Sequence, residues 1–86
     1  MPEISRFYGI IIRMFYNDHN PPHFHAIYGE YEAIFDISTR NIIKGELPPK
    51  AISLVLEWSN QHQNELEANW NRIVKNEQLK PIEPLR

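Results

Sequence analysis

The sequence of 86 residues contains no cysteine. That absence excludes a disulfide framework, a zinc site built on thiolates and a cysteine nucleophile. Apolar runs are short, and none approaches the roughly 20 residues that a helix needs to span a bilayer. The opening segment MPEISRFYG also lacks the basic and apolar parts of a secretory leader. We therefore expect a soluble cytoplasmic protein with no membrane attachment.

Positive charge is not in excess either. Nine Lys and Arg stand against 11 Asp and Glu, which gives a formal net charge of -2. Binding to a phosphate backbone usually requires a basic surface, so this composition does not favour nucleic acid as a partner. Hydrophobic residues at 42% and charged residues at 23% are typical of globular proteins. Because a chain of this length has room for one core, we predict a single domain over residues 1–86.

The first half of the chain has the composition of β-strands. The run FYGIIIRMFY is rich in β-branched and aromatic residues, and NDHNPP would end it. Gly29–Glu30 has the glycine-first pattern of a two-residue type II′ turn, which predicts a hairpin. Paired prolines would end a short fourth strand. The predicted strands are about 7–16, 23–28, 31–37 and 41–45.

The second half has the pattern of a helix. After Pro49 there is no glycine or proline up to about residue 76, and apolar residues recur with a period of 3.6. We predict one long helix at about 49–76, with Ser59 and His62 marking where it would break into two. The tail 80–85 should be extended. The predicted fold class is α+β, a three- to four-stranded antiparallel β-meander packed by one long C-terminal α-helix.

The hairpin turn also predicts which side chains share a face of the sheet. Cross-strand partners lie on the same face, so one face should be apolar and aromatic and should pack against the helix. That face would carry Phe24, Ala26, Tyr28, Tyr31, Ala33 and Phe35.

The opposite face mixes polar and apolar side chains. Its predicted polar members are Arg13, His23, His25, Glu32 and Asp36. Large apolar side chains beside charged ones suggest that a partner protein, a second copy of the chain or the C-terminal tail covers this face. The predicted interface residues are Ile11, Phe15, Ile27 and Ile34.

Three of the four histidines lie in the segment DHNPPHFH, residues 18–25. Two of them fall on the same side of a strand, and a bend at the prolines would return the third toward them. Three imidazoles satisfy an open site for a divalent metal such as zinc or iron. The pattern does not require a cofactor, so the metal is one alternative. Its predicted ligands are His19, His23 and His25, with Asp18, Glu32 or Asp36 to complete the site or orient a ring.

A site without metal is the second alternative. His23 would face Asp36 across the hairpin, and a histidine paired with a carboxylate can act as a general base. Arg13 nearby would hold a phosphate, which completes the residue set of a small ribonuclease. The same pair is more often a simple cross-strand contact, so structural and interface roles stay open. The catalytic candidates are Asp18, His19, His23, His25, Glu32, Asp36 and Arg13.

Four blocks together carry a family resemblance: DHNPPHFHAIYGEYEA, KGELPP, LEWSNQHQNELEANW and KPIEPL. They resemble the bacterial family named domain of unknown function 4160, from about Tyr8 to Leu85. The resemblance implies a partner, because genes of this family often lie beside genes of another small family, domain of unknown function 2442. Such pairs look like toxin-antitoxin modules. The resemblance also implies functional roles for Asp18, His19, His23 and His25, with Glu30 and Glu32 beside them.

Three functions are consistent with these observations. The first is a component, in our interpretation the toxin, of a two-gene toxin-antitoxin-like module, acting through the histidine-bearing face on RNA or another target. The second is a non-enzymatic antitoxin or regulator that uses the same face to bind a partner protein or a second copy. The third is a small histidine-based, metal-dependent enzyme. An enzyme would be ribonuclease-like or a metal-dependent hydrolase.

Overall fold

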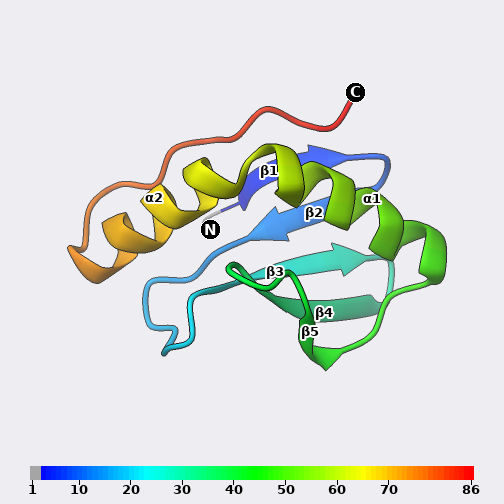
Figure 1. The fold of residues 1–86 in the computed structure, drawn as a ribbon, viewed down its shortest axis with the longest axis horizontal. Helices are drawn as coiled ribbons and strands as arrows, with labels where there is room; N and C mark the ends of the chain where they lie inside the picture. Colours follow the sequence, from blue (N-terminus) through cyan, green and yellow to red (C-terminus); the bar gives the residue numbers. More distant parts are fainter. Residues whose placement is uncertain (1–2) are drawn as a thin grey trace.

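The structure is a computed structural model that describes residues 3–86. Five antiparallel strands form one sheet in chain order, and two helices form a second layer across one face of it (Figure 1). The fold is therefore α+β, as predicted, with five strands where the sequence predicted three or four. The elements are β1 (Glu3–Phe7), β2 (Ile10–Arg13), β3 (His23–Tyr28), β4 (Tyr31–Asp36), β5 (Ile42–Gly45), α1 (Pro49–Gln61) and α2 (Gln63–Val74).

The predicted first strand, 7–16, is wrong because a turn divides this region. Tyr8 and Gly9 both have positive φ, 50° and 80°, and join β1 to β2 as a two-residue loop. Positive φ at both central residues matches the twist of a hairpin. The continuous apolar run concealed this turn, since its strand composition does not change across Gly9. The sheet pairing of β2 ends at Arg13, so the rest of the predicted strand lies in the loop before β3.

The predicted hairpin of β3 and β4 is confirmed, including its register. Phe24 pairs with Phe35 and Ala26 with Ala33, and all four are fully buried against the helix layer. Tyr28 and Tyr31 also pair, but they are 39% and 38% exposed, so their predicted burial is wrong. They flank the turn at the end of the hairpin, where the helix layer does not enclose them.

Two helices replace the predicted single helix at 49–76. The chain leaves helical geometry at His62, which has φ of -122° and ψ of 28° and ends α1 before α2 begins. The break falls at His62, one of the two positions, Ser59 and His62, that the sequence predicts for it, and Pro49 stands in the first turn of α1 as predicted. Trp58 and Trp70, one from each helix, are both buried. Within residues 3–86, neither helix has the length and apolar character to cross a membrane.

The C-terminal tail is extended and runs beside β1 and the helices (Figure 1). Ile82 donates its backbone N–H to the carbonyl of Ile4 at 2.7 Å, and Trp58 donates its indole N–H to the carbonyl of Glu83 at 2.8 Å. Asn69 is fully buried and bonds both backbone groups of Lys80. The tail therefore packs at the β1 edge and does not cover the histidine-bearing face. Of the three covers predicted for that face, the C-terminal tail is wrong.

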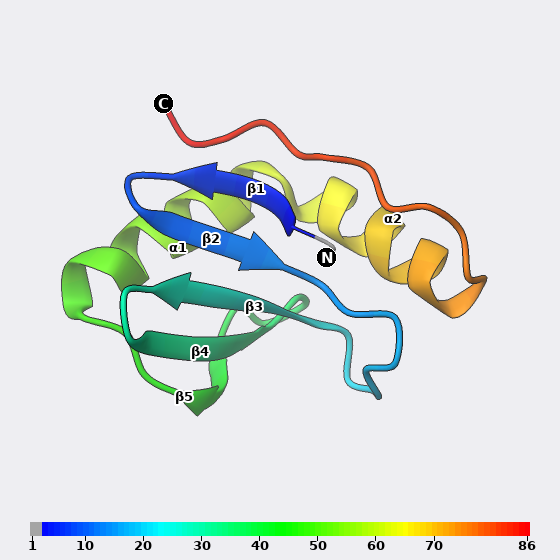
Figure 2. The same ribbon diagram turned by 180° about the vertical axis from the view of Figure 1, so that it is seen from behind.

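The face of the sheet opposite the helices is called the outer face below. In the view from behind, β2, β3 and β4 lie in front of the helices, and no segment of residues 3–86 crosses them (Figure 2). Ile11, Ile27 and Ile34 on this face are all partly exposed. The described part of the chain thus leaves the outer face open.

We predict that Gly45→Ala destabilises the protein more than Gly29→Ala. Gly45 has φ of +82°, and a Cβ there would lie 2.2 Å from the carbonyl oxygen of Glu32. Gly29 also has positive φ, +59°, but a Cβ there meets nothing within 4 Å. The expected losses in free energy of unfolding are about 3 kcal/mol and about 1 kcal/mol, respectively. Denaturant unfolding measures both, and equal losses would contradict the close approach at Gly45.

Candidate functional site

The candidate site lies where the loop between β2 and β3 meets the start of β3. Tyr16 anchors this loop to the tail, because its hydroxyl donates to the carbonyl of Glu77 at 2.7 Å and accepts from the N–H of Leu79 at 3.2 Å. At the other end of the loop, the carbonyl of Pro22 accepts from the N–H of Ile37 at 3.0 Å. These bonds hold both ends of the segment that carries Asp18.

Asp18, His23 and His25 form a cluster, called the Asp–His–His cluster below. Nε2 of His23 lies 3.0 Å from Oδ2 of Asp18, and Nε2 of His25 lies 3.1 Å from the same oxygen. The alternation of β3 places both rings on one side of the strand, and the loop brings Asp18 to them. Their side chains are 11%, 12% and 24% exposed, for His23, His25 and Asp18 in that order. The cluster is therefore shielded, and its carboxylate is the part that solvent reaches most.

The opposite nitrogen of each ring also has a partner. Nδ1 of His23 lies 2.7 Å from the backbone carbonyl oxygen of Pro21. Nδ1 of His25 lies 2.9 Å from Oε2 of Glu32, across the hairpin on β4. These contacts fix the orientation of both rings with Nε2 directed at Asp18.

Aromatic side chains support the two imidazoles from outside the cluster. The ring of Trp70 from α2 lies 5.3 Å from that of His23, centre to centre, and Phe15 meets His25 edge-on at 4.7 Å. His23 is consequently buried at the border with α2, whereas the sequence predicted that it points away from the core. No sequence pattern indicates this contact of Trp70, because a contact with α2 depends on where the helices lie over the sheet.

Arg13 is the nearest cationic residue in the sheet register. It pairs with His25 across β2 and β3 and with Glu3 across β1 and β2, so its side chain shares the outer face with His25. Its Nε is buried and has no hydrogen-bond partner among residues 3–86. A hydrogen bond from Arg6 lowers the pKa of Glu3, and the charge of Arg13 adds a smaller contribution in the same direction. In the sheet register Arg13 thus lies between Glu3 on β1 and His25 on β3.

The structure changes the roles of three predicted residues. His23 and Asp36 pair in register as predicted, but Oδ1 of Asp36 accepts the N–H of Thr39 and does not bond the imidazole. His19 is exposed and lies outside the group of candidate ligands. Glu30 occupies the exposed hairpin turn. Asp18 therefore stands where the sequence predicts His19 in the metal alternative and Asp36 in the metal-free alternative.

The chemistry available to the cluster follows from its donor atoms. Within residues 3–86 it is the one group of three or more His, Asp or Glu side chains that could hold a metal ion, and its ligand atoms all lie within 4.8 Å of one another. An imidazole held by a carboxylate can accept a proton from water or from a hydroxyl group. The same three side chains could hold a divalent metal ion.

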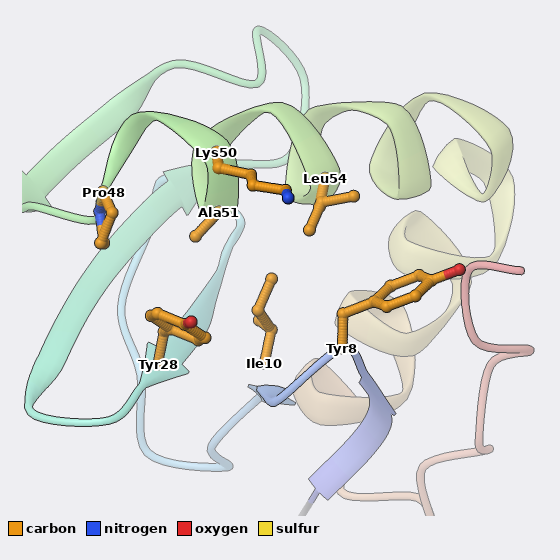
Figure 3. Close-up of a pocket in the computed structure, with 7 residues that line it drawn as sticks. All are labelled: Tyr8, Ile10, Tyr28, Pro48, Lys50, Ala51 and Leu54. Carbon is orange, nitrogen blue, oxygen red and sulfur yellow. The ribbon is translucent and has the colours of Figure 1, made fainter.

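A separate pocket of about 350 Å³ lies between the β1–β2 turn, β2, β3 and the start of α1 (Figure 3). Tyr28 and Ile10 point from the sheet toward Ala51 and Leu54 of α1, with Lys50 above them. Tyr28 ends β3 whereas His23 begins it, so this pocket is at the far end of the strand from the cluster and on the helix side of the sheet. Its lining is mainly apolar and has no paired acid and base, so we assign the candidate site to the cluster.

Comparison with known protein families identifies the family of this protein. Residues 9–71 match the family model described as Domain of unknown function (DUF4160). The chain belongs to this family. The DUF4160 match contains the whole Asp–His–His cluster together with Glu32 and Trp70, whereas the tail that binds Tyr16 lies beyond it. Comparison with curated proteins and with solved structures gave no match.

We predict that His23 carries a proton on Nδ1. A backbone carbonyl only accepts hydrogen bonds, so the 2.7 Å contact with Pro21 requires an N–H on that nitrogen. Long-range ¹H–¹⁵N NMR spectra distinguish the two ring nitrogens, and the exposed ring of His19 provides a reference within the same loop. An unprotonated Nδ1 on His23 would contradict the contact.

Proposed function

We propose that this protein is a small hydrolase that acts through Asp18, His23 and His25, and that it is the toxin component of a two-gene toxin-antitoxin-like module. The observation that carries the enzymatic part is the convergence of two imidazole Nε2 atoms on one carboxylate oxygen, whose side chain is 24% exposed. A structural pair needs one imidazole and one carboxylate. A second imidazole directed at the same oxygen is the arrangement that acid–base or metal-assisted chemistry uses.

RNA is the substrate class that we propose. Hydrolysis of a phosphodiester needs a base for the attacking hydroxyl and a cation for the phosphate oxygens. The cluster would supply the base, as an imidazole or, with a metal ion bound, through a water that the ion activates, and Arg13, the cross-strand neighbour of His25, supplies a guanidinium suited to phosphate. The net charge of -2 argues against binding long nucleic acid through a broad basic surface. We therefore expect contact with a few nucleotides near the cluster, in the cytoplasm.

We predict that expression of the protein alone arrests bacterial growth and that Asp18→Asn or His25→Ala restores it. Loss of an acid–base group typically lowers a rate by roughly 100-fold or more, which is enough to abolish toxicity. Growth after induction and cleavage of labelled RNA by the purified proteins measure the effect. His19→Ala, an exposed histidine next to Asp18, is the matched control and should stay toxic.

Circular dichroism must show that each variant is folded. If folded Asp18→Asn and His25→Ala proteins arrest growth as strongly as the wild type, the cluster is not the active site. If the wild type neither arrests growth nor cleaves RNA, the toxin role is wrong.

A specific observation favours a second function, that of a protein-interaction module. Ile11, Phe15, Ile27 and Ile34 are partly exposed on or beside the same outer face, and β5 is a fully exposed edge strand. We propose that a small protein encoded by an adjacent gene, of the domain of unknown function 2442 type, or a second copy of the chain covers these residues. Co-expression with the product of the neighbouring gene, followed by size-exclusion chromatography with light scattering, tests this. Ile27→Lys should separate the complex and leave the monomer folded.

A further inference from the structure

We propose that the Asp–His–His cluster binds one divalent first-row transition-metal ion through Oδ2 of Asp18 and Nε2 of both His23 and His25. This inference concerns metal binding and does not rest on the proposed hydrolase or toxin role. It follows from the number of protons that the hydrogen-bonded groups require.

The first part of the argument concerns His23. Its Nδ1–H donates to the carbonyl of Pro21, because a carbonyl oxygen cannot donate. A neutral imidazole has one N–H, so Nε2 of the neutral ring carries a lone pair. That lone pair is directed at Oδ2 of Asp18, 3.0 Å away, which is also an acceptor when the carboxyl group is ionised. Two acceptors face each other with no proton between them.

His25 has the same shortage of protons between its ring nitrogens and the acceptor oxygens that they face. Nδ1 faces Oε2 of Glu32 at 2.9 Å and Nε2 faces Oδ2 of Asp18 at 3.1 Å, so both nitrogens of the ring are directed at carboxylate oxygens. In total four ring nitrogens face acceptors, and two neutral rings supply only two N–H groups. A cation at the point where the two Nε2 atoms and Oδ2 converge removes the conflict, because it binds all three lone pairs together. Additional protons, on the rings or on the carboxyl groups, would also satisfy the contacts, and the experiment below separates them from a metal ion.

Two of the three spacings between the ligand atoms fit such an ion. An octahedral ion with bonds of about 2.1 Å has neighbouring ligands about 3.0 Å apart, close to the observed 3.0 and 3.1 Å from Oδ2 to the two nitrogens. All three ligand atoms lie within 4.8 Å, so small side-chain rotations bring them onto one centre. Asp18, at 24% exposed, is the member of the cluster that solvent reaches most, so water or substrate would reach a bound ion from its side.

The atoms behind the ligands match the outer shell of a metal site. Metal-bound histidines almost always direct their other ring nitrogen at a carbonyl or carboxylate, which fixes the tautomer and the ring orientation. Here Pro21 supplies a carbonyl to His23 and Glu32 supplies a carboxylate to His25. His62 has a carboxylate neighbour, Glu65, on one nitrogen but belongs to no such group within residues 3–86. Outer-shell partners on both rings therefore distinguish the cluster from an ordinary histidine–carboxylate pair.

The donor set selects the class of metal. Two imidazole nitrogens and one carboxylate suit Fe(II), Mn(II), Co(II), Ni(II) and Zn(II), whereas Mg²⁺ and Ca²⁺ prefer ligands that are all oxygen. The chain has no thiolate that would favour a softer ion. Which of these ions occupies the site in the cell depends on availability as well as on geometry.

The experiment is a titration of metal-free full-length protein with Zn²⁺ and with Co²⁺, followed by calorimetry and by the visible absorption of bound Co²⁺. We expect one ion per chain. Asp18→Ala and His25→Ala should weaken binding by more than the roughly 10- to 100-fold that outer-shell changes cost. Glu32→Gln should fall within that smaller range, because it alters the orientation of His25 and removes no ligand.

Two histidines outside the cluster supply the controls. His19→Ala should leave the affinity and the Co²⁺ spectrum unchanged, and so should His62→Ala, which removes a histidine that also has a carboxylate partner. Asp18 lies in a loop and not in a strand. If His25→Ala does not fold, Asp18→Ala still tests the proposal.

The proposal is overturned if the folded wild type shows no saturable binding of either ion, which would leave additional protons on the rings or the carboxyl groups as the explanation. It is also overturned if folded Asp18→Ala binds as tightly as the wild type, or if His19→Ala abolishes binding. One-to-one binding without growth arrest would support the metal site and reject the toxin role. Growth arrest that depends on the cluster, without metal binding, would support the toxin role and reject the metal site.

Discussion

The register between β3 and β4 is the constraint on which the rest of the structure depends. A shift by one residue in a strand pairing exchanges the two faces of the strand, because side chains alternate with a period of two. In the observed register Phe24 and Phe35 stack in the core, and His25 lies on the other face beside Glu32. Core packing therefore positions the imidazole, since the energy that buries the phenylalanines also fixes where His25 points.

The loop between β2 and β3 adds the third side chain and shows how distant segments meet. Asp18 reaches the two imidazoles only because the loop folds back over the start of β3, and Tyr16 anchors that loop to the tail. Trp70 brings α2 against His23 on the opposite side. The site is thus assembled from the loop, two strands, one helix and the tail, although its three central residues lie within eight positions of the sequence.

The sequence predicted the features that depend on local periodicity. The turn at Gly29, the face that carries His25, the helix start at Pro49 and the break at His62 all follow from short patterns, and the structure has each of them. The turn at Gly9 was missed because apolar residues continue on both sides of it. The partner of His23 was assigned to Asp36, since strand register places the two opposite each other. The structure gives that role to Asp18, whose position depends on loop conformation and tail contacts that no periodic pattern encodes.

The bond between Tyr16 and the tail has a consequence for energetic coupling across the molecule. Residues 77–79 hold the loop that carries Asp18, and Lys80 and Ile82 hold the tail against α2 and β1. Docking of the tail therefore restricts the conformations of the loop. Tail docking and ordering of the loop that carries Asp18 are thus linked by a coupling free energy. Such coupling is reciprocal: a ligand that stabilises Asp18 in place strengthens tail docking by the same factor by which tail docking strengthens the ligand. Residues 77–82 of the tail are in this sense coupled to the candidate site, although none of them contributes a side chain to it.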